Sequence, residues 1–326
     1  MIRTFRKLSS ALVVALAMAL VGCDSMIYED LTDCPQEVSF HLFRQTPCDG
    51  TVRYYPQEIK DVHIFAFDQT NTFVRKFSAS NLVLTPDYRL TVPFDIQGKF
   101  TFVAWGSDSI DCYKTSDFTE GVTTKSELIE SLTHPAGSVN EMPSRLFFGQ
   151  YGDSLTRDYK AKSGSHLDTL GLNMLEYTYR LTVNIYGLDS TKTYKVYITD
   201  NNDAYDFDGH MLTGRPEFAY NAEPDRYGTL LSSSFTTLQL TEGGNSRLIV
   251  YNETDDKEVY NAKLVDDLIM FRGGRTQPPY SLDCKHDFNI HLWLEKDPVV
   301  TTDTYMVVRA IVDDWNVITR SVTPRG

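Results

Sequence analysis

The chain has 326 residues and a formal net charge of -13, with 44 acidic side chains against 31 basic ones. An acidic surface repels phosphate, which argues against nucleic acid as a partner and against a basic patch that binds anionic lipid. The length is enough for two domains, and the 19 Tyr and 18 Phe favour strands over helices.

The N-terminal segment has the pattern of an export signal. Three basic residues within the first seven precede a mostly apolar stretch over residues 8–21, which is shorter than the roughly 20 residues that span a membrane. Gly22 is the small residue that precedes a cleavage point, and Cys23 follows it directly. The pattern predicts a lipoprotein signal over residues 1–22, cleavage between Gly22 and Cys23, and lipidation of Cys23. The alternative is an ordinary signal peptide in which Cys23 falls by coincidence.

The four other cysteines are Cys34, Cys48, Cys112 and Cys284. In an exported chain they are free to form disulfides, and four cysteines allow three pairings. Cys34 with Cys48 closes the shortest loop, but free, buried thiols are an equally good interpretation. The spacing does not suggest zinc.

In the first half of the chain, segments of strand length recur between turn signals. Residues 23–37 lack apolar periodicity and are expected to form a lipidated tether. One helix is expected after Thr124, which has capping-box spacing with Glu127, with Leu128, Ile129 and Leu132 along its apolar side. Strands are expected at 38–43, 59–67, 72–77, 89–94, 100–105 and 146–150.

The second half repeats this pattern, with a helix expected at 262–270. Strands are expected at 177–185, 194–199, 235–240, 247–251, 288–294, 305–312 and 315–322. The predicted fold class is therefore mainly all-β, with two tandem β-sandwich domains over 38–174 and 175–326 and one or two short helices.

No catalytic, cofactor or metal site is expected, because the chain lacks a phosphate-binding loop, a nucleophile elbow and an HExxH motif. His286 and His291 are five apart on a predicted strand and so point to opposite faces. The acidic run 200–209 has enough oxygens for calcium, but Asx-type turns are the favoured interpretation. Asp313 and Asp314 are interpreted as a turn.

Several segments, taken in order, resemble the fimbrial anchor lipoproteins of Bacteroidales, the base subunits of type V pili. The likeness extends over nearly the whole chain, and each motif is weak by itself. The segments are Cys23–Leu31 followed by Asp33–Pro35, Val62–Asp68, Gly98–Gly106, Leu146–Gly149, Arg247–Asn252 and Ile311–Trp315.

The resemblance implies two transthyretin-like domains and a non-enzymatic role in cell adhesion. It implies a lipid-anchored, surface-exposed protein of the outer membrane, at the base of a fimbrium. Its partner would be a fimbrial stalk subunit (a fimbrillin), and the anchor would hold the fimbrium and limit its length. Such subunits join by adding a strand to an open sheet edge.

In polymerising relatives, a cut after a basic residue removes an N-terminal strand. Here a cut after Arg44 or Arg53 would separate the fold from Cys23, so we expect no trimming there and contact with the stalk through another edge. A candidate is the C-terminal segment, with Val317, Ile318 and Val322 as donor-strand residues. The alternative is that this segment is the last strand of its own sandwich.

Two other functions are open. One is a tip or accessory fimbrillin, which would be cleaved near its N-terminus. The other is a surface glycan-binding lipoprotein, which would display exposed aromatic platforms. Against the latter, the chain has only three tryptophans, and Trp105 and Trp293 fall within predicted strands.

Overall fold

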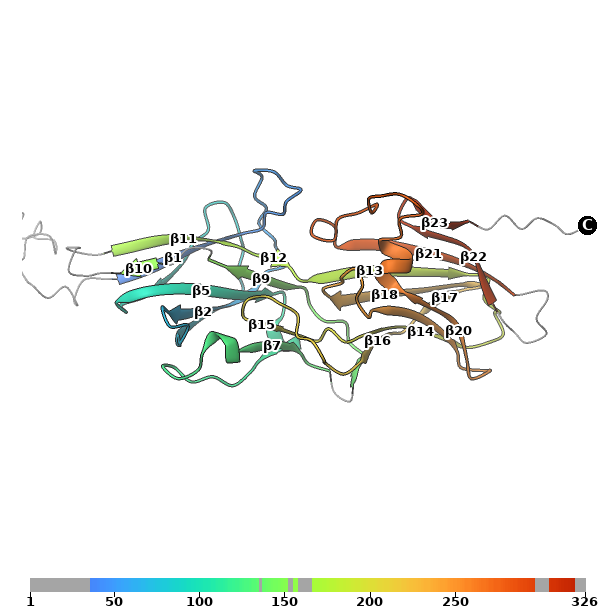
Figure 1. Cartoon of the computed structure of the whole chain (residues 1–326), viewed down its shortest axis with the longest axis horizontal. Helices are drawn as coiled ribbons and strands as arrows, with labels where there is room; N and C mark the ends of the chain where they lie inside the picture. The colour runs from blue at the N-terminus through green and yellow to red at the C-terminus, as the bar shows by residue number, and fades with distance from the viewer. Residues whose placement is uncertain (1–35, 135–136, 152–154, 158–165, 297–304, 320–326) are drawn as a thin grey trace, which may run out of the picture.

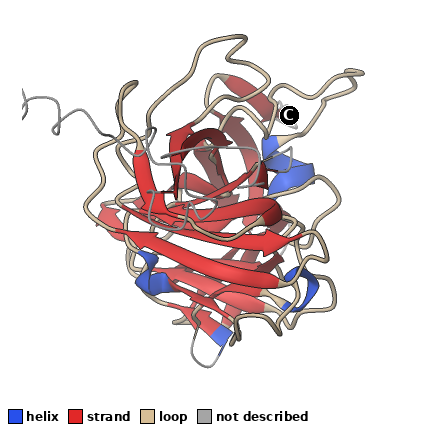
Figure 2. Ribbon diagram, turned by 90° about the vertical axis from the view of Figure 1, so that its left-hand side faces the viewer, coloured by secondary structure: helices blue, strands red, loops and turns tan. Residues whose placement is uncertain are grey.

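The computed structural model describes residues 36–134, 137–151, 155–157, 166–296 and 305–319. The predicted fold class is confirmed: the chain is mainly β, with two β-sandwiches in tandem along its long axis (Figure 1). Strands stack in layers and helical turns are few and short (Figure 2). No helix in the described ranges is long and apolar enough to cross a membrane.

In the N-terminal sandwich, a three-stranded sheet faces a larger one. The small sheet has β1 (Gln36–Phe43) between β11 (His166–Asn173) and β4 (Leu90–Pro93). The large sheet runs in the order β12 (Leu175–Glu176), β9 (Leu146–Gln150), β5 (Gly98–Ser107), β2 (Asp61–Asp68) and β3 (Phe73–Ala79), with β10 (Leu155–Arg157) paired to β5.

Aromatic rings fill the space between these two sheets. Phe40 of β1 packs edge-on against Phe102 of β5, with ring centroids 5.2 Å apart, and Phe94 packs likewise on Phe100 at 4.9 Å. All four side chains are buried. Full burial of each such ring contributes roughly 1.5–3 kcal/mol, so the sandwich depends on β1 keeping its place.

The C-terminal sandwich has six strands in one sheet and five in the other. The first sheet runs β17 (Asp225–Tyr227), β18 (Leu230–Leu238), β13 (Thr178–Tyr186), β21 (Asp287–Lys296), β22 (Tyr305–Val312) and β23 (Trp315–Thr319). The second runs β20 (Lys257–Lys263), β19 (Arg247–Asn252), β14 (Tyr194–Asp200), β16 (Phe218–Ala222) and β8 (Ser138–Val139).

Two short strands cross between the halves of the sequence. The strand β8 comes from the first half but pairs with β16 of the C-terminal sandwich. In return, β15 (Ala204–Asp206) pairs with β7 (Ile129–Leu132), which also pairs with β6 (Tyr113–Thr115). The division into domains at 38–174 and 175–326 stays a proposal, because a strand from each half of the sequence pairs with a strand from the other half.

The helix predicted after Thr124 is wrong. The capping contact exists, because the Thr124 N–H donates to Glu127 Oε2 at 2.7 Å, but only a 3-10 turn follows, η3 (Lys125–Glu127). A similar turn, η2 (Ile110–Cys112), precedes β6. Beyond η3 the chain continues as β7, in which Glu130 and Leu132 are buried. Pairing with β6 and β15 on its two sides overrides the helical pattern.

The helix predicted at 262–270 is present but shorter. It is a π-helix, η6 (Leu264–Ile269), with the predicted apolar side chains buried. Ala262 instead lies at the end of β20. The Met270 N–H donates to the Val265 carbonyl at 2.8 Å, the wide spacing typical of a π-turn.

Candidate functional site

The first strand is the central strand of the small sheet in the N-terminal sandwich. β1 pairs in parallel with β11 along its whole length and antiparallel with β4 on its other side. Val38, Phe40 and Leu42 are at most 1% exposed. The predicted lipidation residue Cys23, the cleavage point after Gly22 and the start of the tether lie outside the described residues.

After β1 the chain turns at the junction between the sandwiches. Arg44 and Tyr54 exchange two backbone hydrogen bonds of 2.8 Å, and the Arg53 guanidinium stacks 4.1 Å from the centre of the Phe43 ring. Gln45 and Asn173 also exchange two hydrogen bonds, of 2.8 and 2.9 Å. These contacts hold the turn in a defined position at the end of β11.

A disulfide joins this turn to the C-terminal sandwich. Cys48 pairs with Cys284, with Cα atoms 5.9 Å apart and a sequence separation of 236. Of the interpretations left open by the sequence, the pairing of Cys34 with Cys48 and a free Cys48 are therefore both wrong. Cys48 and Cys284 pair because the fold brings them together across the junction, although the loop between them is very long. Cys112 is free, and Cys34 lies outside the described residues.

The disulfide also corrects the expectation about cleavage. A cut after Arg44 would leave the preceding segment, including β1, attached to the fold only by noncovalent contacts. A cut after Arg53 would leave Cys48 on the N-terminal fragment, still bonded to Cys284. Only the first of the two cuts would break every covalent link between the fold and Cys23.

Charged side chains reinforce the same junction around a hollow of about 390 Å³. Arg145 pairs with Glu58 at 2.6 Å, and Arg180 reaches Asp287 at 2.6 Å while also bonding the buried Glu176. The hydrogen bond from Arg180 holds the pKa of Asp287 below its usual value. The network balances acids against bases, so the hollow has no strong preference for a charged ligand.

Carboxylates of the acidic run 200–209 are engaged by other side chains. Asp200 accepts from Ser246 at 2.7 Å, and Asp203 accepts from Arg215 and His134 at 2.5–2.8 Å. Burial raises the pKa of Asp203, but these hydrogen bonds outweigh burial and lower it overall. Among the described residues, no three His, Cys, Asp or Glu side chains gather as metal ligands would.

The two histidines of the C-terminal sandwich are kept apart. His286 precedes β21, is buried, and has Nδ1 3.0 Å from the Thr178 carbonyl oxygen. His291 is partly exposed, with Nδ1 3.2 Å from the Tyr186 hydroxyl. They therefore have separate surroundings.

The faces of the tryptophan rings are largely covered. Trp105 is fully buried. Trp293 of β21 stacks on Tyr186 of β13 with centroids 4.8 Å apart, and Arg309 of β22 lies 4.8 Å from its centre. Because β13 and β22 flank β21 on opposite sides, both faces of the Trp293 ring are occupied.

The C-terminal strand β23 is the edge of its sheet and pairs with β22. Asp313 and Asp314 form the tight turn between them, with Asp313 at φ 50. Val317 is 6% exposed and belongs to the core of its own sandwich. Ile318 pairs through its backbone with Ala310, and Val322 lies outside the described residues. Val317 is thus packed in its own sandwich, and a donor role for Val317, Ile318 and Val322 stays a prediction.

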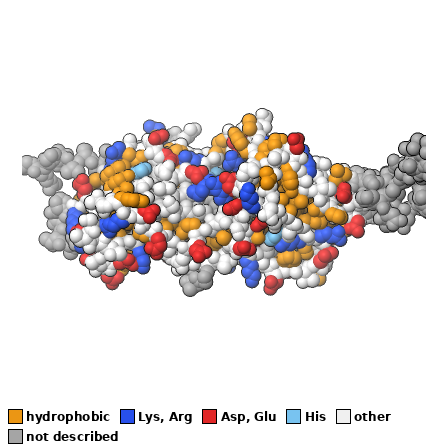
Figure 3. All heavy atoms as spheres, turned by 180° about the vertical axis from the view of Figure 1, so that it is seen from behind, with side chains coloured by type: hydrophobic (Ala, Val, Ile, Leu, Met, Phe, Trp, Pro, Cys, Tyr) orange, Lys and Arg blue, Asp and Glu red, His pale blue; other side chains and the backbone are white. Residues whose placement is uncertain are grey.

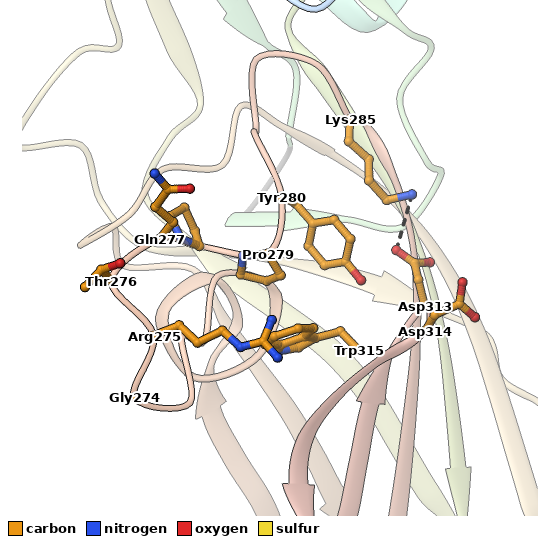
Figure 4. A pocket seen from close by; sticks show the side chains of 11 residues that line it. Gly274, Arg275, Thr276, Gln277, Pro279, Tyr280, Lys285, Asp313, Asp314 and Trp315 are labelled. Atoms are coloured by element: carbon orange, nitrogen blue, oxygen red, sulfur yellow. Dashed lines mark ion pairs between the residues drawn. The ribbon is translucent and has the colours of Figure 1, made fainter.

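A pocket of about 880 Å³ opens beside the start of β23 (Figure 4). The Arg275 guanidinium lies 4.1 Å from the centre of the Trp315 ring. The Tyr280 hydroxyl donates to the Val312 carbonyl at 2.7 Å, and Lys285 pairs with Asp313 at 3.3 Å. Sequence reasoning missed this pocket, because Arg275 and Trp315 are brought together only by the fold.

On one face of the described part of the molecule, side chains of both charges lie close to one another (Figure 3). Figure 3 shows basic, acidic and apolar side chains interspersed over one face of both sandwiches. Such a surface does not suit the regular array of phosphates in a nucleic acid.

Comparison with known proteins gives consistent matches. A family model described as fimbrillin-A associated anchor proteins Mfa1 and Mfa2 matches residues 31–321. The minor fimbrium anchoring subunit Mfa2 of Porphyromonas gingivalis is 26% identical over 305 residues, which cover 93% of this chain and 92% of that protein. The solved structure of the fimbrial anchor protein Mfa2 from that organism matches with a TM-score of 0.75 at 23% identity, over 88% of this chain and 100% of that one. A candidate polysaccharide-binding protein from Bacteroides thetaiotaomicron matches with a TM-score of 0.70 at 19% identity, over 89% and 99%.

Proposed function

Because the chain belongs to the family of fimbrillin-A associated anchor proteins, we propose that it is the non-enzymatic anchor at the base of a fimbrium. Acyl chains on Cys23 hold it at the outer membrane, exposed at the cell surface. The stalk subunit binds it by strand-type contacts, and this capping of the base limits fimbrial length.

The observation that carries this proposal is the position of β1. A polymerising subunit needs an open groove for its neighbour's strand. Here β1 occupies the slot between β11 and β4 with its apolar side chains buried. While β1 is retained, the N-terminal sandwich has no groove at this position for a neighbour's strand, and β1 is continuous with the predicted tether. A cut after Arg44 that removed β1 would instead open the groove of a polymerising subunit. Retention of β1 suits a subunit that ends a polymer at the membrane.

The stalk contact is assigned to the outer edge of β23. Within the described part of the chain, β23 has a partner strand on one side only. An open sheet edge offers unpaired backbone groups to an incoming strand, and the pocket beside Trp315 can accept a side chain of that strand. Donation of β23 itself is less well supported, because Val317 is built into its own core.

Glycan binding is not favoured by the surroundings of the tryptophans. Sugar stacking needs an open aromatic face, whereas Trp105 is buried and Trp293 is covered on both faces. Trp315 has Arg275 over one face.

Deleting the gene tests the anchor role. The expected result is long fimbriae shed into the medium, restored to the cell by the parent gene and by Cys112→Ser but not by Cys23→Ser. Fimbriae that stay attached at normal length after the deletion would contradict the proposal.

The β23 edge is tested in a Cys112→Ser background. A bulky maleimide on Asn316→Cys should weaken binding of purified stalk subunit, whereas the same label on Glu258→Cys should not. Glu258 is exposed on β20, the edge of the opposite sheet. Equal binding by both labelled proteins would rule out the β23 edge.

A further inference from the structure

We propose that the Cys48–Cys284 disulfide is a mechanical link between the two sandwiches, which transmits tension from β1 into the C-terminal sandwich. The role of this disulfide in the cell rests on the proposed function, in which the membrane anchor pulls on the N-terminus of the chain. The mechanical behaviour of the protein does not depend on that function.

The bond joins two strands that lie in different halves of the long axis. β1 lies in one half and β21 in the other, with the junction between them (Figure 1). Cys48 follows the end of β1, and Cys284 precedes the start of β21. A pull that enters through β1 therefore has a covalent route to β21 through the bond, and the intervening chain, with a sequence separation of 236, cannot be drawn out while the bond is intact.

Each of the two strands is held on both sides. β1 pairs with β11 and β4, and β21 pairs with β13 and β22. Neither is an edge strand. Load that enters either one is shared with two neighbours, so the bond ends in well-supported parts of both sandwiches.

The direction of load in the C-terminal sandwich follows from the register. Thr319 at the end of β23 pairs with Arg309, and Arg309 pairs with Trp293 near the far end of β21. The chain thus leaves the sheet at the end opposite Asp287. Tension between Cys284 and this exit runs along the strands and loads their hydrogen bonds together in shear, so they cannot open one at a time.

The noncovalent links across the junction, which include the buried ring contact of Trp105 with Tyr205, are each weaker than a covalent bond. β7 with β15 and β8 with β16 form only short ladders of three and two residue pairs. The pairs of Arg145 with Glu58 and Arg180 with Asp287 each lie within one sandwich, and an ion pair that crosses the junction joins Glu176 of β12 to Arg180 of β13. The disulfide is the covalent member of this set, and it remains when the others yield.

Single-molecule stretching of the full mature chain tests the proposal, with handles at position 23 and after Gly326. Oxidised protein should extend only by the residues outside the 48–284 loop. Dithiothreitol should add about 80 nm, because an extended chain spans roughly 3.3–3.6 Å per residue. C48S/C284S should show the long extension without reductant, and Cys112→Ser should behave like the parent.

Full-length extension of the oxidised parent would overturn the load path. In cells, the C48S/C284S variant should retain fimbriae in still medium and lose them under shear flow, and equal retention under shear would overturn the role in the cell. If instead deletion of the whole gene leaves fimbriae attached, the proposed function fails, whatever the stretching shows.

Discussion

Trp105 of β5 and Tyr205 of β15 pack ring against ring, with centroids 5.9 Å apart. One residue belongs to the N-terminal sheet and the other to a strand from the second half of the chain. Both are fully buried, so the hydrophobic core continues across the junction. We therefore expect the two sandwiches to unfold as coupled units.

Removing the hydroxyl of Tyr205 should destabilise this shared core. The hydroxyl oxygen accepts hydrogen bonds from Asn202 Nδ2 at 3.1 Å and the Gln239 N–H at 2.9 Å. Tyr205→Phe leaves a buried donor without its partner, which costs about 1–3 kcal/mol. Urea unfolding measures the loss. Tyr227→Phe is the control because Tyr227 is 68% exposed, and equal effects of the two changes would contradict this assignment.

Loss of the disulfide should lower the free energy of unfolding by about 2–5 kcal/mol, since the bond restricts a very long loop in the unfolded chain. Urea titrations of the parent and of C48S/C284S give the difference. Dithiothreitol should destabilise the parent by a similar amount and leave the double variant unchanged. A double variant as stable as the oxidised parent would disprove the stabilising role.

A nick after Arg53 should leave the N-terminal fragment attached. Arg53 is exposed, so brief trypsin treatment can reach it, with mass spectrometry to assign the cut. On a denaturing gel, the fragment should separate from the body only after reduction in the parent, and without reduction in C48S/C284S. Release from the oxidised parent would mean that Cys48 is not bonded to Cys284.

Glu130 should make the protein less stable as the pH rises. Burial raises its pKa to about 7, although a hydrogen bond from Thr115 and the charge of Lys76 act in the opposite direction. Between pH 4.5 and about 7 the folded state keeps a proton that the unfolded state has lost, so the free energy of unfolding falls with pH in that window.

The corresponding test is Glu130→Gln. Its stability relative to the parent should improve by up to roughly 3 kcal/mol between pH 4.5 and 7.5. Unfolding titrations at several pH values give the curve. Glu120→Gln, at an exposed position, should run parallel to the parent. A flat difference for Glu130→Gln would show that Glu130 is ionised in the fold.

Gly187 should tolerate a side chain less well than Gly214. It has φ +88, and a Cβ there would collide with the Leu294 carbonyl oxygen on β21. Gly214 has a similar φ of +72 but open space around it. Gly214→Ala should cost about 1 kcal/mol from backbone strain, and Gly187→Ala a further 1–3 kcal/mol or so from the displaced backbone. Thermal unfolding compares them, and equal melting temperatures would contradict the close approach.

Strands rich in apolar residues were predictable from the sequence. The ranges 146–150 and 305–312 coincide with β9 and β22. The strand at 235–240 was placed too late, because β18 begins at Leu230 and carries several serines. The crossing strands β8 and β15 contain two and three residues, too few for any periodicity to show.

The contacts that define the junction were not predictable. The helical pattern after Thr124 fails because Leu128, Glu130 and Leu132 also alternate in a strand, and only β6 and β15 decide between the two. The Cys48–Cys284 pairing and the stacking of Arg275 on Trp315 each depend on segments distant in sequence. The residue types and their neighbours in the sequence do not indicate the disulfide or the stacking.

The pairing of β1 with β11 has a consequence for the order of biosynthesis. In a chain exported from its N-terminus, residue 36 emerges early, yet its partner His166 arrives much later. The first strand can pair early with β4, but its pairing with β11 must wait, because such distant pairing closes slowly. Cys48 waits longer still for Cys284. The Cys48–Cys284 bond can therefore form only after residue 284 has been translocated.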